Sequence, residues 1–389
     1  MHLLWIMEHT KELSTLFSYD RIVTYPSGTL MSLPFMFTRQ LGTKEIFRIQ
    51  EHMAVAPFCP SPDPDINENR QFKYVVFVPS GATRFNRAII LLHGLNERSW
   101  DKYLSWAEDL VRTCGVPVVL FPIAFHMNRT PATWYAPRWL QPWLSRRKQE
   151  IRNLCNASFL NLALSSRLSV SPLRFYSSGL ESAFNLTQLI MDMKNGAHPL
   201  FKENVQVDFF AYSIGALLAQ VLLMADPRKC LGTSKLFAFC GGSVFERMNG
   251  NARDIIDQEA YQKIRNFYLQ DFLAEDPAVK DPSGSSGYGF EEAFRLLIPS
   301  VEQTGKRGSF FDAGTKRIRM VSLRQDVVIP TAGLYEAVGT GAGKGIVEEL
   351  DFPYAYTHQT PFPENGKIPP EELSVSFRSV FDRAAVLLA

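Results

Sequence analysis

Short, almost wholly apolar runs alternate with longer amphipathic stretches along most of the chain. Residues 73–79 (KYVVFVP), 87–94 (RAIILLHG) and 116–122 (VPVVLFP) are rich in valine, isoleucine and leucine. Their length and apolar character are typical of strands that are buried on both faces. Residues 99–115 separate the last two runs and have helical spacing. This strand–helix–strand order predicts a parallel sheet that is covered by helices.

The same alternation returns after about residue 176. It predicts further strands and helices in turn, namely a helix at 177–196, a strand at 205–212, a helix at 214–226, strands at 235–242, 317–323 and 346–352, and a closing helix at 371–388. We therefore expect an α/β fold with a mostly parallel sheet and helices on both faces.

Three stretches interrupt this pattern. Residues 1–70 have weak periodicity and end in a loop rich in Pro, Asp and Asn, so we interpret them as an N-terminal extension or a small appended layer. Residues 71–389 then form the main domain. Within it, about 130–176 and 244–314 are expected to be helical lid insertions.

Composition excludes several classes of protein. The net charge is +2 and no long Lys/Arg run is present, so we expect no nucleic-acid partner. No apolar stretch reaches the roughly 18 residues of a membrane span. The first residues lack a basic leader, and Met1 or Met7 could be the start. Five scattered cysteines favour reduced thiols and a cytoplasmic location. The oligomeric state is left open.

A lone serine stands where a predicted strand meets a predicted helix. In VDFFAYSIGALLAQ, Ser213 has Ala211 two residues before it and Gly215 two residues after it. Small neighbours allow a tight strand-to-helix turn that exposes the hydroxyl above the sheet. The N-terminus of the following helix favours developing negative charge at that point. These features predict a nucleophile at Ser213.

A nucleophilic serine needs a base and an orienting acid, which in this architecture follow it in the order acid, then histidine. His358, in FPYAYTHQTPFP, is the single histidine after Ser213. Asp326, in MVSLRQDVVIP, follows an earlier predicted strand and is our candidate acid. Glu246, after KLFAFCGGSVF, is the alternative acid.

Two backbone amides could stabilise an oxyanion. Gly94 follows a buried strand in RAIILLHGLN and lets the chain turn closely, which leaves the N–H of Leu95 free to donate. The N–H of Ile214, directly after the serine, would be the second donor. His93 is expected to hold the loop through side-chain hydrogen bonds.

Four motifs together resemble the α/β-hydrolase superfamily of serine hydrolases. They are LLHGLN, AYSIGA, RQDVVIP and YTHQTPF, in that order, within residues 73–125, 178–243 and 315–389. Ala211 stands where the commonest elbow has glycine. The chain is similar to a bacterial branch of unsettled function, so the resemblance implies the fold and the reaction type and leaves the substrate open.

The predicted function is hydrolysis of an ester, thioester or amide through an acyl-enzyme, as in an esterase or lipase acting on a partly apolar small molecule. A non-catalytic binding protein and an acyltransferase with the same triad are the alternatives. No HExxH motif and no GxGxxG after a strand are present, so we expect no metal and no cofactor.

Three further residues are candidates for the substrate pocket. His126 and Arg129 follow the strand VPVVLFP and should emerge at the same sheet edge as Ser213, and Trp134 begins the first insertion. Arg129 could bind a carboxylate or tie the insertion to the body, and the second role is the one we favour. The aromatic residues of the insertions could line an apolar pocket, although anchoring the lid is the favoured role for most of them.

Overall fold

A nine-stranded sheet forms the centre of the protein. The computed structural model describes residues 5–59, 61–81, 83–274, 289–299, 301, 304–363 and 366–389. The strand order is β1-β2-β3-β5-β4-β6-β7-β8-β9. The strands are β1 Val23–Thr24, β2 Leu30–Thr38, β3 Gln71–Pro79, β4 Phe85–Leu92, β5 Val118–Leu120, β6 Phe201–Tyr212, β7 Leu236–Phe239, β8 Ile318–Leu323 and β9 Val347–Leu350.

Strands β4 to β9 pair in parallel, whereas β3 is antiparallel to both of its neighbours, β2 and β5. The predicted α/β fold with a mostly parallel sheet is confirmed. The β3-β5-β4-β6 order with an antiparallel β3 is that of an α/β-hydrolase sheet.

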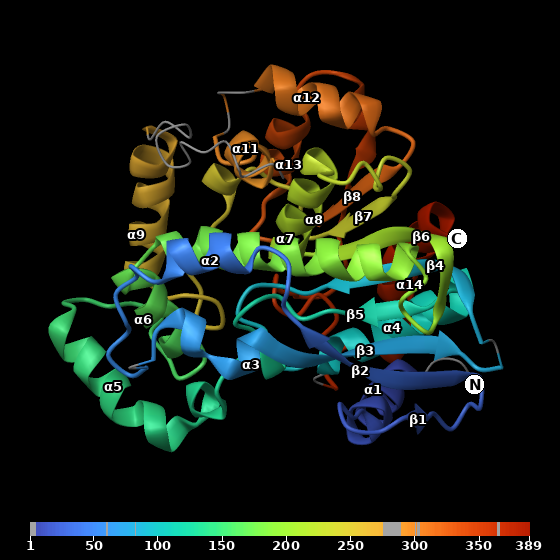
Figure 1. Cartoon of the computed structure of the whole chain (residues 1–389), viewed down its shortest axis with the longest axis horizontal. Helices are drawn as coiled ribbons and strands as arrows, with labels where there is room; N and C mark the ends of the chain where they lie inside the picture. Colours follow the sequence, from blue (N-terminus) through green and yellow to red (C-terminus); the bar gives the residue numbers. More distant parts are fainter. Residues whose placement is uncertain are drawn as a thin grey trace.

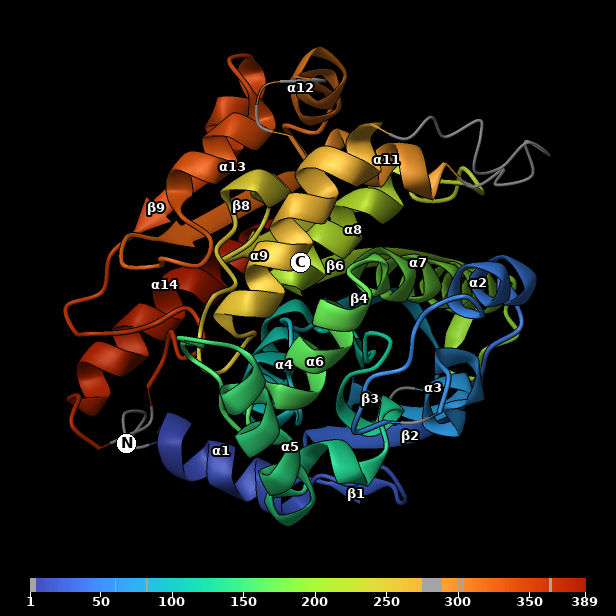
Figure 2. The same ribbon diagram turned by 90° about the vertical axis from the view of Figure 1, so that its left-hand side faces the viewer.

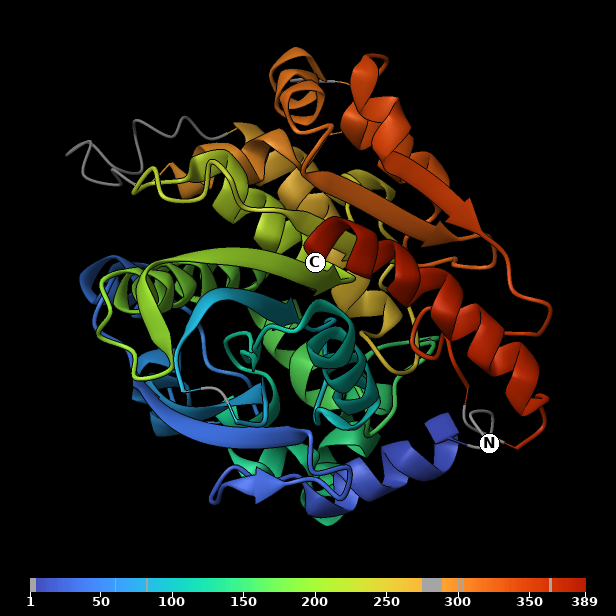
Figure 3. The same ribbon diagram turned by 90° about the vertical axis from the view of Figure 1, so that its right-hand side faces the viewer.

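Helices cover both faces of the sheet (Figure 1). Because successive side chains of a strand point to opposite faces, each strand supplies two cores. In β4, Ala88, Ile90 and Leu92 belong to the core under α7 and α8, and Ile89 and Leu91 belong to the core under α4 and α14. Figure 3 shows α4 (teal) and α14 (red) on this second face. These helices are α4 Asp101–Cys114, α7 Leu173–Lys194, α8 Ile214–Ala225 and α14 Pro370–Leu388.

The N-terminal part of the chain contributes to the same sheet. All nine residues of β2 pair with β3, from Leu30 opposite Pro79 to Thr38 opposite Gln71. Helix α1 packs beside α4, and α2 packs beside α7. These elements are α1 Trp5–Leu16, α2 Thr43–Gln50 and α3 Asn67–Arg70. Residues 23–70 therefore widen the sheet and brace α7.

The two irregular stretches are helical and come together over one end of the molecule, where α5, α6 and α9 gather (Figure 2). Helices α6 and α9 contact each other, and α11 packs on α8. The elements are α5 Pro137–Glu150, α6 Leu162–Val170, α9 Gln258–Asn266, the π-helical turn Phe267–Phe272, α11 Phe290–Leu296, α12 Thr304–Ala313 and α13 Thr331–Val338. Residues 275–288 of the second stretch lie outside the described residues.

None of the helices in the described part of the chain combines the length and the apolar character of a membrane span.

Candidate active site

Ser213 occupies a sharp turn between β6 and α8. Its backbone has φ 56° and ψ −123°, a sparsely populated conformation for a residue with a side chain. Its neighbours leave no room for larger residues. A Cβ on Gly215 would lie 2.7 Å from the carbonyl oxygen of Leu92, and one on Gly241 would lie 2.8 Å from that of Ser213. The turn is therefore held in a strained geometry by close backbone packing on both sides.

The three residues predicted as nucleophile, base and acid meet at this turn. Ser213 Oγ lies 2.7 Å from His358 Nε2, and His358 Nδ1 lies 2.7 Å from Asp326 Oδ2. All three residues are buried, with 3–5% of their surface exposed. Because the carboxylate accepts from Nδ1, the proton of a neutral imidazole sits on Nδ1 and Nε2 is free to accept the serine proton.

Asp326 is fixed by backbone amides of its own loop. Its Oδ1 accepts hydrogen bonds from the N–H groups of Val328 and Ile329, each at 2.9 Å, while Oδ2 faces His358. The alternative acid, Glu246, lies in a short 3₁₀ turn whose amide bonds to Ile298. The contact to the histidine is thus made by Asp326.

Tyr212 contacts His358 through a hydrogen bond and a ring stack. Its hydroxyl donates to the carbonyl oxygen of His358, and the two rings stack with centroids 5.4 Å apart. Lys102 lies 4.6 Å from the centroid of the Tyr212 ring and forms an ion pair with Glu97. Sequence reasoning missed Tyr212, because a tyrosine in an apolar strand reads as core.

The predicted oxyanion donors flank the serine. Leu95 and Ile214 line the same two cavities, and neither N–H has a backbone or side-chain acceptor among the described residues. His93 keeps the loop in place, as expected. Its Nδ1 donates to the Gly94 carbonyl at 2.8 Å, and its Nε2 accepts from the Ile123 amide at 2.9 Å. Burial, followed by the nearby His126, lowers the pKa of His93 well below its usual value, so the ring is neutral.

Two small cavities, of about 60 Å³ each, meet at Leu95, Phe175 and Ile214. The first, here called the His126 cavity, also contacts α7, α8 and α11. The second, here called the Ser213 cavity, contains the nucleophile candidate and is bounded by α9 and the loop after Asp326. Both have mostly apolar walls. Beyond the shared residues, the Ser213 cavity is lined by Ser213, Phe245, Met248, Gly250, Ile255, Ile256, Tyr261, Ile264, Arg265, Val328 and Ile329.

His126 is placed as a neutral hydrogen-bond acceptor. Its Nδ1 donates to the Ala124 carbonyl at 2.9 Å, and its buried Nε2 has no hydrogen-bond partner among the described residues. Burial lowers the pKa of His126 to about 4. The ring lines its cavity in the form that accepts a hydrogen bond from a ligand hydroxyl or N–H group.

Arg129 and Trp134 do not line either cavity, which corrects their assignment to the substrate pocket. Arg129 is completely buried and its guanidinium donates to Asn69 Oδ1 at 3.0 Å and to the Pro122 carbonyl at 2.9 Å. Trp134 is buried against Phe58 with ring centroids 6.0 Å apart. Both side chains anchor the loop and the first insertion, because packing turned them toward the protein body.

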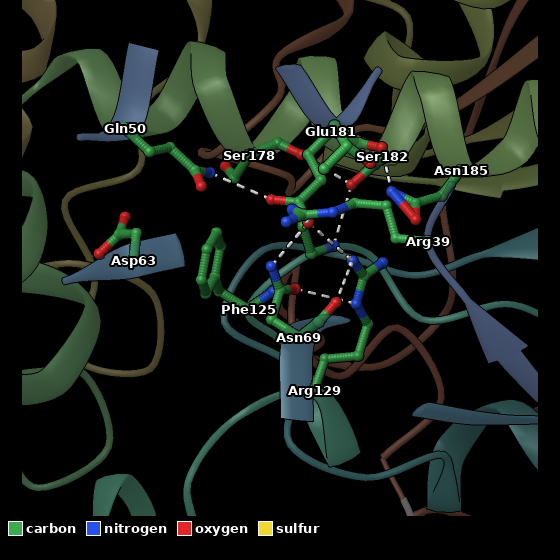
Figure 4. Close-up of polar contacts among 12 residues, drawn as sticks. Arg39, Gln50, Asp63, Asn69, Phe125, Arg129, Ser178, Glu181, Ser182 and Asn185 are labelled. Carbon is green, nitrogen blue, oxygen red and sulfur yellow. Dashed lines mark hydrogen bonds and ion pairs between the residues drawn. The ribbon is translucent and has the colours of Figure 1, made fainter. Parts of the chain in front are cut away.

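A buried network centred on Glu181 of α7 supports this loop (Figure 4). Arg39 forms an ion pair with Glu181, and Asn69 Nδ2 and Gln50 Nε2 donate to its carboxylate at 2.8 and 3.1 Å. Asn69 Oδ1 also accepts a hydrogen bond from the backbone N–H of Phe125 at 3.1 Å.

The loop that this network supports is strained. Phe125 has φ 61° and Met127 has φ 50°, on either side of His126. Such conformations persist where their surroundings over-determine them. Residues 39–70 therefore help to fix the wall of the His126 cavity, a role that their sequence did not indicate.

The chain matches one family over residues 44–389, described as "Family of unknown function (DUF6051)". This protein belongs to the DUF6051 family. The family description names no reaction, and no curated protein matches the sequence.

Solved structures resemble this DUF6051 protein distantly. Carboxyl esterase 2 from the mycorrhizal fungus Tuber melanosporum is 10% identical with a TM-score of 0.43, over 98% of this chain and 96% of that one. An acetyl xylan esterase from Paenibacillus sp. R4 is 11% identical with a TM-score of 0.42, over 98% and 94%. Vibralactone cyclase is 9% identical with a TM-score of 0.44, over 99% and 87%. Likenesses this distant carry no information on substrate.

Within the described residues of this DUF6051 protein, no group of three or more His, Cys, Asp or Glu side chains could hold a metal ion.

Proposed function

We propose that this protein is a serine hydrolase that cleaves an ester, thioester or amide through an acyl-enzyme, with a carboxylesterase-like preference for a partly apolar substrate. The observation that carries the proposal is the chain of 2.7 Å contacts from Ser213 Oγ to His358 to Asp326, on a strained strand-to-helix turn. In this proposal Ser213 is the nucleophile, His358 the general base and Asp326 the orienting acid.

The geometry supports acylation that begins with attack by Ser213 and transfer of its proton to His358. His358 Nε2 takes the proton of Ser213 as Oγ bonds to the substrate carbonyl carbon, and the carbonyl oxygen becomes an oxyanion. The N–H groups of Leu95 and Ile214 are proposed to stabilise that charge. The oxyanion then re-forms the carbonyl, the bond from its carbon to the leaving oxygen, sulfur or nitrogen breaks, and the protonated His358 gives its proton to the leaving alcohol, thiol or amine, which leaves acyl-Ser213. Asp326 accepts hydrogen bonds from two amides and from the imidazolium, so it orients His358 and stabilises the positive charge that forms there.

Deacylation repeats the sequence with water. His358 removes a proton from water, the hydroxide oxygen bonds to the acyl carbon, and Ser213 leaves with the proton that His358 returns. The acid product and free enzyme result. An acyltransferase differs only in that an acceptor alcohol or amine replaces this water, and a non-catalytic binding protein would use the same cavities without forming the acyl-enzyme.

The substrate is proposed to be a small molecule whose two halves enter the two cavities. A site for one water molecule takes up roughly 15 Å³ on the same measure. A cavity of about 60 Å³ therefore holds a chain of about four heavy atoms. The half that enters the His126 cavity would gain from a hydroxyl or N–H donor facing His126 Nε2. We also propose a bacterial branch of the α/β-hydrolases and a cytoplasmic location, the second supported by five cysteines without a disulfide.

A fluorophosphonate probe tests the proposal directly. The wild-type protein should be labelled at Ser213, and Ser213→Ala should abolish labelling and lower kcat on simple nitrophenyl esters by about 10⁶-fold. Ser309→Ala, at an exposed serine of α12, is the matched control. Full labelling of Ser213→Ala, or no labelling of the wild type, would reject the serine hydrolase. Product analysis with added alcohols separates hydrolysis from acyl transfer.

A further inference from the structure

Arg265 stands out among the residues that line the Ser213 cavity. It lies near the end of α9 and is the single charged residue in that lining. Its Nη1 atom is buried and has no hydrogen-bond partner, and no ion pair to Arg265 is formed within the described residues. The guanidinium therefore lines a mostly apolar cavity and has no counter-charge among the described residues.

Several other arginines in the described part of the chain have protein partners. Arg174 pairs with Asp63 at 2.9 Å, and Arg147 pairs with Asp257 at 2.7 Å. Arg307 donates to the carbonyl oxygens of Ala337, Leu296 and Pro299. Arg265 is half-buried, and its buried Nη1 is left with a donor that a ligand in the cavity can satisfy.

We propose that Arg265 binds a carboxylate of the substrate, so that the natural substrate is an ester, thioester or amide that carries a negative charge. The proposal rests on the proposed function, because it takes the same cavity to hold the scissile bond at Ser213. The planar guanidinium matches the two oxygens of a carboxylate, and a group of three heavy atoms fits a cavity of about 60 Å³.

The lining restricts what else the substrate can be. The remaining walls of the Ser213 cavity are mostly aliphatic and aromatic. The hydroxyl of Tyr261, which also lines it, donates a hydrogen bond to the Met248 carbonyl oxygen at 3.2 Å. Such walls favour a short hydrocarbon spacer between the scissile bond and the carboxylate. Monoesters of short dicarboxylic acids, and short esters of hydroxy acids, have this form.

Matched pairs of esters test the inference. Monoethyl glutarate and ethyl pentanoate differ only by a terminal carboxylate in place of a methyl group on the acyl half, and butanoyloxyacetate and ethyl butanoate differ in the same way on the alcohol half. Acid release at pH 7.5 gives kcat/KM for each. The wild-type enzyme should prefer the charged member of one pair by at least about tenfold. The preferred pair identifies the half of the substrate that contacts Arg265.

Variants then assign the preference to Arg265. Arg265→Met should lower the charged-to-neutral ratio of kcat/KM by about 100-fold, mainly through KM of the charged ester, and Arg265→Lys should restore part of it. Lys263→Met removes an exposed positive charge from the same helix and should keep the wild-type ratio. A ratio that is the same in wild type and Arg265→Met, with neutral esters still cleaved, would overturn the inference.

Stability supplies a second readout. Because Arg265 lacks a partner in the described residues, Arg265→Met should leave Tm unchanged or raise it, whereas a structural arginine would lower it. A clear fall in Tm together with an unchanged ratio would assign Arg265 a structural role and reject the substrate contact.

Failure of the proposed function is recognised separately. If neither labelling nor hydrolysis of any ester occurs, the serine hydrolase is rejected. Calorimetric binding of monoethyl glutarate then tests Arg265 alone, with binding to the wild type and at least tenfold weaker binding to Arg265→Met as the expected result. Equal binding to both proteins, or to neither, would reject the carboxylate site.

Discussion

The hydroxyl of Tyr212 donates a hydrogen bond to the backbone carbonyl of His358, and its ring stacks on the imidazole with 5.4 Å between the centroids. Tyr212 directly precedes Ser213, so one strand end places the nucleophile candidate and also steadies the base candidate. The contact joins the end of β6 to a loop 146 residues away in the sequence.

Tyr212→Phe should therefore disturb the histidine without removing any ring packing. It leaves the His358 carbonyl without its donor, which should lower stability by about 1–3 kcal/mol. We expect kcat to fall about tenfold, because the base is less well oriented, with KM little changed. Urea unfolding and ester kinetics measure both. Tyr335→Phe, at an exposed tyrosine, is the control, and equal kinetics for the two variants would contradict the role of Tyr212.

Asp326→Asn should be far more damaging than Glu246→Gln. The amide that replaces the Asp326 carboxylate would favour the wrong imidazole tautomer, and kcat should fall on the order of 10⁴-fold. Glu246→Gln should change kcat by less than about threefold. Steady-state kinetics on one chromogenic ester compares the two. A severe loss confined to Glu246→Gln would make Glu246 the acid.

Arg129→Met should reduce stability rather than substrate selectivity. The arginine lies 3.6 Å from Glu181 in a fully buried pair, and removing one partner of such a pair costs about 3–5 kcal/mol. Tm should fall, and all substrates should be affected alike because the strained loop loosens. Arg48→Met, at an exposed position of α2, should have no such effect. A rise in KM for carboxylate substrates alone, at unchanged Tm, would show instead that Arg129 binds substrate.

Acid should destabilise the protein through its buried histidines. Burial lowers the pKa of His126 to about 4, below the value of 6.5 for the unfolded chain, so the unfolded state binds the extra proton first. The stability from this group is complete above pH 6.5 and is lost as the pH falls toward 4. From pH 7 to pH 5 the loss should be roughly 2 kcal/mol.

His126→Gln should therefore reduce the difference in unfolding free energy between pH 7 and pH 5 by about that amount. Burial also lowers the pKa of His93 and of His198, the latter to about 4, so part of the acid sensitivity should persist in the variant. His52→Gln, whose side chain is 83% exposed, is the control. The same acid sensitivity in His126→Gln and wild type would contradict the assignment.

Filling the His126 cavity should shorten the preferred substrate. Gly179 lines this cavity, and a Cβ built on it meets no atom within 4 Å, so the Cβ of Gly179→Leu is accommodated and its remaining carbons would take up space beside the cavity. In series of nitrophenyl acyl esters and of butanoate alkyl esters, the wild type should prefer chains of about four carbons. The variant should shift one series to about two carbons. No shift in either series would show that the cavity takes no part of the substrate.

Much of this organisation follows from the sequence alone. Nearly continuous apolar runs such as residues 87–92 are typical of strands that are buried on both faces, so they predicted a parallel sheet. The structure confirms that class of fold. Ser213, Asp326 and His358 were predicted together because strand ends of a parallel sheet share one edge, and the structure brings them within hydrogen-bond distance. Chain order and local turn chemistry suffice for such inferences.

The tertiary structure decided what depends on the direction of a side chain. Arg129 and Arg265 are both arginines beside the site, yet packing turns Arg129 into a buried network with Asn69 and Glu181 and leaves Arg265 lining the Ser213 cavity without a partner among the residues that the structure describes. Sequence spacing does not encode this difference, because the partners lie about 50 to 60 residues away or are missing. The support that residues 39–70 give to the loop around His126 has the same origin. The buried carboxylate of Glu181 needs hydrogen-bond donors, and these come from the segments that pack around it in the folded protein.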